Sequence, residues 1–246
     1  MSLAQRMKDA LPHGIKRKIR EIRHRDDSGL YSAMLSLDQN SGVIFDVGAN
    51  VGNLSLAFCR WFPRATVHGF EPASKMFAEM NARIEAAGFA DRFRGHQIGF
   101  FDQEKVAELN LASQHGANSL MGIGDAYHAA NPNIGVEATE SISLVRMDDF
   151  VRDNSIKHID LVKIDVEGVE NAVLLGGAET FRSMVDVVIM EVSFVRHERS
   201  EGAHIQLFHT MHDLGFAPSY LFDVEQAGSP ETPWRLNQVD CVFRKM

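Results

Sequence analysis

The 246-residue chain lacks several features that mark particular classes of protein. It has only two cysteines, Cys59 and Cys241, and both lie in apolar settings, which argues against a disulfide framework or a zinc site and favours core positions. No apolar run reaches the length of a membrane span, and the N-terminus has no apolar core of the kind found in signal peptides. Internal repeats and low-complexity tracts are also absent. We therefore expect a cytoplasmic protein with one substantial core.

Charge is unevenly distributed along the chain. Residues 1–25 contain eight Lys or Arg and two acidic residues, whereas the whole chain has a net charge of −8. The body is therefore acidic, which argues against a nucleic acid partner because phosphate binding needs a broad basic surface. Apolar residues between Leu11 and Ile22 recur at helical spacing and predict a basic helical extension over residues 1–40. We expect this extension to pack on its own domain; weak contact with an anionic membrane surface is the alternative.

A strand followed by a glycine-containing turn begins at Val43. The run VIFDVGANVGN, residues 43–53, leads into the helical pattern Leu54 to Trp61, which is how a nucleotide-binding βαβ unit opens. Glu71 ends the next apolar stretch, where an acidic side chain accepts hydrogen bonds from both ribose hydroxyls. We expect the glycines to let backbone N–H groups approach the ligand closely.

The turn differs from a dinucleotide fingerprint. The pattern G-x-G-x-x-G needs glycine where the pyrophosphate and the helix press on the backbone, and Asn50 and Asn53 stand at or near those places. Gly48 and Gly52 instead form a G-x-x-x-G loop led by Asp46, a carboxylate that suits a ligand with an ammonium and a sulfonium group. The pattern predicts S-adenosylmethionine. A nicotinamide-dependent oxidoreductase and a non-catalytic nucleotide-binding protein are the alternatives.

Apolar runs and helical patterns alternate along the chain, which predicts an α/β fold with a mainly parallel sheet. The stretch from about Gln103 to Ser143 is less regular. There the sequence predicts short strands at Glu108 to Leu111 and Ser141 to Val145, with a loop near the cofactor at Ser113 to Gly124. Two closing strands separated by Glu225 to Asn237 predict a hairpin with one antiparallel strand. The predicted strands are Val43 to Val47, Ala65 to Phe70, Phe93 to Ile98, Ile159 to Val166, Val185 to Val192, Ser219 to Phe222 and Val239 to Phe243. The predicted helices are Leu54 to Trp61, Ser74 to Ala87, Glu170 to Leu175 and His204 to Leu214.

A second informative block is DLVKIDVEGVE, residues 160–170. A period of two puts Lys163, Asp165 and Glu167 on one face if the strand persists. Charges in a core strand are best accommodated at its carboxyl end, the edge where open α/β sheets bind ligands. Glu191 ends the next core strand and is expected to open onto the same crevice.

These residues are candidates for proton removal. Asp165 or Glu167 is the candidate base with Lys163 as its counterion, and His197 is a second candidate because its unperturbed pKa is near neutral. Carboxylates also stabilise the N-terminus of a following helix, a role that we favour for Glu170, while we favour catalysis for Asp165.

A divalent metal is an alternative at the same edge. Asp165 and Glu191 end adjacent strands and offer the oxygen ligands that Mg²⁺ takes, and such a metal lowers the pKa of an acceptor hydroxyl. Only two ligands can be placed, so we disfavour it. Asp148 and Asp149 precede a helical pattern and are expected to cap a helix rather than form a catalytic pair.

Five motifs occur in order between Gly42 and Val192: VIFDVGANVG, GFEP, RMDDF, DLVKIDVEGVE with VLLGG, and VIME. Together they resemble the FkbM-type S-adenosylmethionine-dependent methyltransferases, with KIDVEGxE the most specific part. The resemblance implies a class I methyltransferase domain over residues 41–246, with a doubly wound, mainly parallel seven-stranded sheet and an antiparallel last strand. It also implies methyl transfer to a hydroxyl of a sugar, glycan or polyketide-like metabolite. The candidate catalytic residues are Asp165, Glu167, Lys163, Glu191 and His197; the candidate cofactor-binding residues are Asp46, Gly48, Asn50, Gly52, Asn53, Glu71, Pro72, Gly99 and Asp165.

Overall fold

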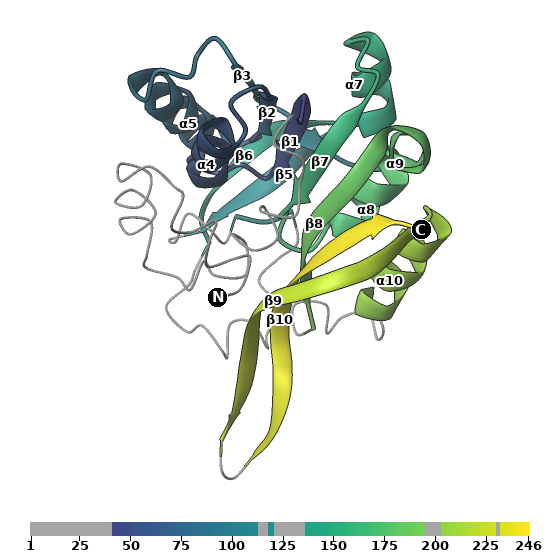
Figure 1. The fold of residues 1–246 in the computed structure, drawn as a ribbon. Helices are drawn as coiled ribbons and strands as arrows, with labels where there is room; N and C mark the ends of the chain where they lie inside the picture. The colour runs from purple at the N-terminus through teal and green to yellow at the C-terminus, as the bar shows by residue number, and fades with distance from the viewer. Residues whose placement is uncertain (1–40, 113–117, 121–135, 195–202, 230–231) are drawn as a thin grey trace, which may run out of the picture.

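The computed structural model describes residues 41–112, 118–120, 136–194, 203–229 and 232–246. Three expectations fall outside these ranges: the basic extension over residues 1–40, His197, and most of the loop from Ser113 to Gly124. The described residues form a central sheet with helices on both faces and a second, smaller sheet (Figure 1).

The central sheet has seven strands. They are β1 (Val43–Val47), β2 (Thr66–Phe70), β3 (Phe93–His96), β7 (Ile159–Ile164), β8 (Val185–Ser193), β9 (Phe216–Ser229) and β10 (Thr232–Lys245), in the order β3-β2-β1-β7-β8-β10-β9. β1 pairs in parallel with both β2 and β7, so the chain winds outward in two directions from this strand. β8 is parallel to β7 and β10 is antiparallel to β8. This confirms the predicted doubly wound sheet with an antiparallel last strand.

Helices cover both faces of this sheet (Figure 1). On one face lie α4 (Asn53–Trp61) and α5 (Ser74–Ala86), and on the other lie α7 (Met147–Asp153), α8 (Glu170–Gly176), α9 (Ala178–Met184) and α10 (Ala203–Asp213). The sequence patterns did not predict α9, because Gly176 and Gly177 indicate a helix end and the new helix begins directly after them. Within the described ranges, no helix combines the length and apolar character that a membrane crossing needs.

Alternation along β1 and β7 explains how charged residues enter the core sheet. Ile44 of β1 and Leu161 of β7 pack on the α4 side, whereas their sequence neighbours pack on the α7 side. The next position on the α4 side is Asp46 in β1 and Lys163 in β7, each one residue before its strand ends, and the two are register partners. Opposite charges therefore replace apolar side chains at the carboxyl ends of two neighbouring strands. Both predicted core cysteines are buried.

The second sheet confirms the two short strands predicted in the irregular stretch. It consists of β4 (Gly99–Phe100), β5 (Lys105–Ala112) and β6 (Val136–Val145), in the order β4-β6-β5. Its apolar side packs against Ala73 and Met76 at the start of α5. Glu140 of β6 accepts a hydrogen bond from the amide of Ser74 at 3.0 Å. The small sheet thus fixes the N-terminus of α5, next to the end of β2.

The C-terminal hairpin is longer than predicted. The sequence suggested a separating segment from Glu225 to Asn237, yet β9 and β10 continue through most of it because their backbones pair with each other. β8 pairs with β10 only from Gln238 to Arg244, and the partner of Gln238 is Ser193, the last residue of β8. The hairpin therefore projects past the carboxyl end of β8 (Figure 1).

The turn after β1 provides a test of packing at this edge. A Cβ on Gly48 would lie 1.8 Å from the carbonyl oxygen of Asp165, and Gly48 has a φ of +81°. Gly88 is a matched control, because its φ is +78° and no atom lies within 4 Å of its Cβ position. We expect Gly88→Ala to cost about 1–2 kcal/mol of backbone strain, and Gly48→Ala to cost about 1–3 kcal/mol more because of overpacking. Urea unfolding measures both losses, and equal losses would contradict the close packing.

Candidate active site

The loop from Gly48 to Gly52 joins β1 to α4 beside the end of β2. Both glycines have left-handed φ values, +81° and +78°, which glycine adopts without strain. The amides of Gly48 and Ala49 donate to the carbonyl of Phe70 at 3.0 and 2.9 Å. The loop is thereby fixed to the residue that precedes Glu71.

The other amides of this loop also have acceptors within the protein. Asn50 donates to Oε2 of Glu71 at 2.8 Å, Val51 donates to Oδ1 of Asn50 at 2.8 Å, and Gly52 donates to the carbonyl of Ala49 at 2.9 Å. The glycines therefore let the loop close on itself, and each of these amides has an acceptor in the protein. The expectation that the loop N–H groups approach a ligand stays a prediction.

Glu71 is the side chain that this loop orients. Its Oε2 accepts from the amide of Asn50 and its Oε1 accepts from the amide of Ala73 at 2.9 Å. The residue is 7% exposed, and burial raises the pKa of its carboxyl to about 7 although both amide hydrogen bonds lower it. Each carboxylate oxygen has a second lone pair, so two further donors can be accepted without disturbing the loop.

Asp46 lies beneath the loop. It is 2% exposed, and its Oδ2 accepts a hydrogen bond from Oγ of Ser55 in α4 at 2.6 Å. Burial raises the pKa of its carboxyl to about 6, while the Ser55 hydrogen bond and the charge of Lys163 lower it. The side chain therefore ties β1 to α4, and its charge interacts with Lys163.

Three further candidates from the sequence are accounted for by packing. Oδ1 of Asn53 accepts from Nη2 of Arg83 at 2.7 Å, which joins α4 to α5. A Cβ on Gly99 would lie 2.7 Å from a methyl of Leu144 and 3.7 Å from Pro72, so Gly99 permits the close approach of the small sheet. Asn53 thus belongs to the helix pair, and Gly99 and Pro72 to the contact between the two sheets.

Lys163 is the buried centre of the carboxyl edge. Its side chain is 4% exposed, and its Nζ lies 3.6 Å from Oδ2 of Asp165 and 3.6 Å from Oδ1 of Asp240. Burial alone would lower the pKa of this ammonium, but the carboxylates of Asp165, Asp240, Glu191 and Asp46 raise it above its usual value. The lysine therefore stays charged and holds acids from several strands together.

Glu191 of β8 lies on the same edge. Asp240 is its register partner on β10, and Nε2 of Gln238 donates to its Oε2 at 3.3 Å. Burial and the nearby charges of Asp165 and Asp240 raise the pKa of its carboxyl, although Lys163 lowers it. The structure thus brings Asp165 and Glu191 to one edge, as the strand ends predicted.

The chain turns immediately after β7. Because β7 ends at Ile164, the period-two alternation does not extend to Glu167, whose φ of +58° belongs to a turn. Asp165 is held by its amide, which donates to the carbonyl of Val47 at 2.9 Å, and its side chain is 38% exposed. Oε1 of Glu170 accepts from the amide of Gly168 at 2.9 Å at the start of α8, which supports the predicted helix-terminal role.

Sequence reasoning missed three polar residues of this site. Ser55 holds Asp46, and Asp240 and Gln238 reach the edge from β10. A signal for Asp240 was present, because it is a lone acid within the apolar run Val239 to Phe243. Nothing in the sequence indicated which strand would lie next to β8.

The predicted metal ligands do not form a three-ligand group at this edge. Among the residues described, the group whose ligand atoms lie within 4.8 Å of one another is His158, Asp160 and Asp186, at the amino ends of β7 and β8. There Nε2 of His158 pairs with Asp186 at 3.0 Å, and Oδ2 of Asp160 accepts two backbone amides. The cation found among the carboxyl-edge acids is Lys163.

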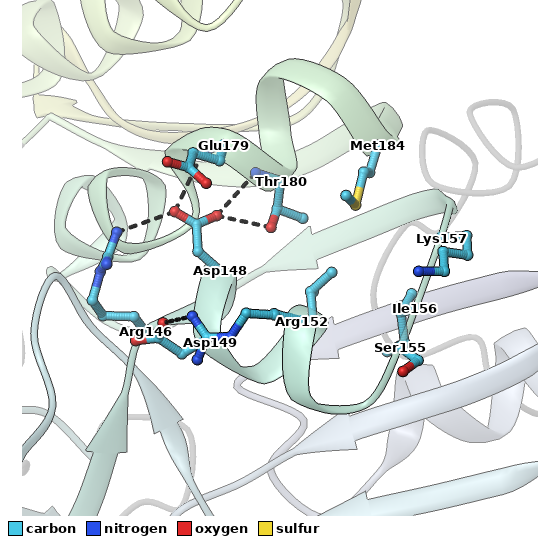
Figure 2. Close-up of a pocket in the computed structure, with 11 residues that line it drawn as sticks. Arg146, Asp148, Asp149, Arg152, Ser155, Ile156, Lys157, Glu179, Thr180 and Met184 are labelled. Carbon is cyan, nitrogen blue, oxygen red and sulfur yellow. Dashed lines mark hydrogen bonds and ion pairs between the residues drawn. The ribbon is translucent and has the colours of Figure 1, made fainter.

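A cavity of about 400 Å³ lies between α7 and α9 (Figure 2). Oδ1 of Asp148 accepts from the amide and the hydroxyl of Thr180 at 2.9 and 2.8 Å, and Oδ2 pairs with Arg146 at 3.1 Å. The predicted cap of the helix that follows is therefore wrong, because α7 begins at Met147 and both Asp148 and Asp149 lie within its first turn. Asp148 instead accepts hydrogen bonds at the N-terminus of α9, and Asp149 pairs with Arg152. The cavity is also lined by Lys157 and Met184, which precede β7 and β8. It therefore lies toward the amino ends of these strands.

Comparisons with known proteins agree with this architecture. A family model described as the methyltransferase FkbM domain matches residues 46–218. The 31-O-demethyl-FK506 methyltransferase FkbM of Streptomyces tacrolimicus is 29% identical over 170 residues, which cover 61% of this chain and 65% of that protein. The chain thus spans just under two thirds of that relative's length. The 2-O-methyltransferase NoeI of Sinorhizobium fredii is 25% identical over 187 residues, 73% of each protein.

A solved structure shares the fold. An rRNA methylase from Streptococcus thermophilus superimposes with a TM-score of 0.51 at 10% sequence identity, covering 91% of this chain and 98% of that one. At this identity the likeness concerns the fold alone, which is that of the class I methyltransferases. The family match covers well over half of the chain, including the loop, Glu71, Lys163 and Glu191, whereas Asp240 lies beyond it. The chain belongs to the FkbM methyltransferase family.

Proposed function

We propose that this protein is an S-adenosylmethionine-dependent O-methyltransferase that acts on a hydroxyl of a sugar, glycan or polyketide-like metabolite. The observation that carries the proposal is the placement of Glu71, rigidly held beside the loop after β1, next to an edge on which Asp165, Glu191 and Asp240 surround Lys163. The two O-methyltransferases among the relatives support transfer to oxygen.

The residues at this edge fit the proposed cofactor. The carboxylate of Glu71 has capacity for the two ribose hydroxyls, because its amide partners occupy one lone pair on each oxygen. Asp46 and Asp165 provide negative charge for a ligand that carries an ammonium and a sulfonium group. A dinucleotide fits poorly, since the loop amides that would bind its pyrophosphate already have protein acceptors. This disfavours the nicotinamide alternative.

The chemistry asked of the chain is modest. S-adenosylmethionine supplies a methyl group on a sulfonium centre that is already a good leaving group. The protein then has to hold the acceptor oxygen in line with the methyl carbon and accept the hydroxyl proton. Proximity supplies a large part of such a rate enhancement, so one well-placed base and a shaped crevice suffice.

Two carboxylates are proposed for proton removal. Asp165 is the more accessible, with a side chain 38% exposed and Lys163 as its counterion. Glu191 is the second candidate, and burial raises the pKa of its carboxyl, which makes its carboxylate more basic than that of an ordinary glutamate. Glu167 stays a third candidate for the base. His197 stays a candidate on the sequence alone, because it lies outside the described residues.

The acceptor is proposed to be a small molecule or glycan rather than a nucleic acid. The chain has a net charge of −8, and the edge described here carries several carboxylates around one buried lysine. Such an edge repels a phosphate backbone.

The first test concerns cofactor and acceptor. We expect calorimetry to show binding of S-adenosylmethionine and no binding of NAD, because Glu71 is available for a ribose while the loop amides are not available for a pyrophosphate. Incubation with S-adenosylmethionine and a panel of hexoses, deoxyhexoses and a macrolide lactone is expected to yield S-adenosylhomocysteine and a methylated product by mass spectrometry. Binding of NAD alone would overturn the proposal.

A second test uses the pKa of Glu71. Ribose hydroxyls donate to the ionised carboxylate, so below a pKa of about 7 binding must first remove a proton. We expect the affinity for S-adenosylmethionine to rise as pH increases from 6 through 7 and to level off above 8, by up to about tenfold per pH unit below the pKa. In Glu71→Gln the affinity is expected to fall by about 1–3 kcal/mol and to lose most of this dependence on pH. An unchanged pH profile in a variant with normal melting would place the ribose elsewhere.

A third test separates the two proposed bases. We expect Asp165→Asn or Glu191→Gln to lower kcat by on the order of 10²-fold when the substituted residue is the base, with affinity for the cofactor little changed. The other variant is expected to have a much smaller effect. Rates measured after exhaustive chelation are expected to equal the untreated rates, because Lys163 supplies the cation at this edge. Full turnover in both variants would remove both residues from the catalytic list.

A further inference from the structure

The C-terminal hairpin brings polar residues to the carboxyl edge from outside the run of parallel strands. On β10, the register partners Asp240–Glu191 and Val242–Ile189 show that Asp240 lies on the α4 side of the sheet. Lys163 lies on this same side, with Ile189 as its register partner on β8. The alternation along β10 also puts Gln238 on this side.

Asp240 reaches Lys163 across an intervening strand. β8 lies between β7 and β10 in the sheet, yet Oδ1 of Asp240 lies 3.6 Å from Nζ of Lys163. The distance from the same nitrogen to Oδ2 of Asp165 is also 3.6 Å. Both distances exceed the 2.7–2.9 Å or so of a direct charge-assisted hydrogen bond, so the ammonium lies between the two acids rather than on either one.

This sharing affects the proposed base. An ammonium in direct contact with Asp165 would occupy a carboxylate oxygen that the acceptor hydroxyl has to reach. Asp240 is less accessible than Asp165, with side chains 19% and 38% exposed, so Asp240 is placed to hold the lysine while Asp165 stays the more open to solvent. Gln238 holds Glu191 in a similar way, because Nε2 of Gln238 donates a hydrogen bond to Oε2 of Glu191 at 3.3 Å.

We propose that Asp240, supported by Gln238, is a positioning residue of the methyl-transfer site, which acts by drawing Lys163 away from Asp165. The proposal rests on the proposed function of this edge in methyl transfer. It makes the C-terminal hairpin a part of the catalytic apparatus rather than only an edge of the sheet.

The contact itself can be tested without an acceptor. In protein labelled with ¹⁵N at lysine Nζ, the buried ammonium of Lys163 is expected to give a resonance protected from solvent exchange, assigned by its loss in Lys163→Arg. Asp240→Asn is expected to shift this resonance. Asp223→Asn is the matched control, because Asp223 is an exposed aspartate on β9 of the same hairpin, and it should leave the resonance unchanged. An unshifted resonance in Asp240→Asn would overturn the proposal.

Kinetics with the acceptor identified from the panel test the positioning role. We expect Asp240→Asn to lower kcat by about tenfold with the KM for S-adenosylmethionine and the melting temperature little changed. In the Asp165→Asn background the same substitution is expected to lower kcat by less than about twofold, because the residue acts through Asp165. Equal falls in both backgrounds would show an independent role and contradict the proposal. Failure of the proposed function is recognised separately, by absent cofactor binding in the parent protein.

Discussion

The carboxyl edge of this sheet depends on the interaction of the buried Lys163 ammonium with the carboxylates around it. Burying one charge in a core sheet is costly unless partners with opposite charge surround it. Here Asp165 follows β7 itself, while Glu191 and Asp240 come from β8 and β10 and Asp46 comes from β1. Each acid interacts with the same cation, and the pKa of the lysine is raised because together the acids outweigh its burial. The register of the strands therefore determines which charged groups interact at the site.

The loop after β1 has a different role from the one that its glycines suggest. Its amides bind Phe70, Glu71 and atoms of the loop itself, so the glycines give a closed turn instead of an open cradle. The consequence is a fixed Glu71, whose two oxygens are oriented before any ligand arrives. This rigidity favours the proposed binding of a ribose, because an already oriented side chain loses little conformational entropy when it binds. The small sheet adds to it by fixing the start of α5, one turn from Glu71.

The hairpin of β9 and β10 brings Asp240 and Gln238 to the charged residues at the carboxyl edge of the sheet. Its pairing with β8 places Asp240 opposite Glu191, while the longer part of the hairpin continues past the end of β8. The acidic residues of this edge therefore range from Asp46 in β1 to Asp240 in β10. The last of the five sequence motifs lies in β8, well before Asp240.

The sequence by itself determined the doubly wound fold, the turn after β1, Glu71 at the end of β2 and the charged end of β7. These follow from local patterns: apolar alternation defines strands, glycines define turns, and a charge in an apolar strand is accommodated at the strand end. Only the tertiary structure decided what those residues contact. The closed loop amides, the end of β7 before Glu167 and the reach of Asp240 to Lys163 across β8 depend on strand order and register. Strand order brings together residues far apart in the chain, and the period-two pattern of one strand carries no information about its neighbour.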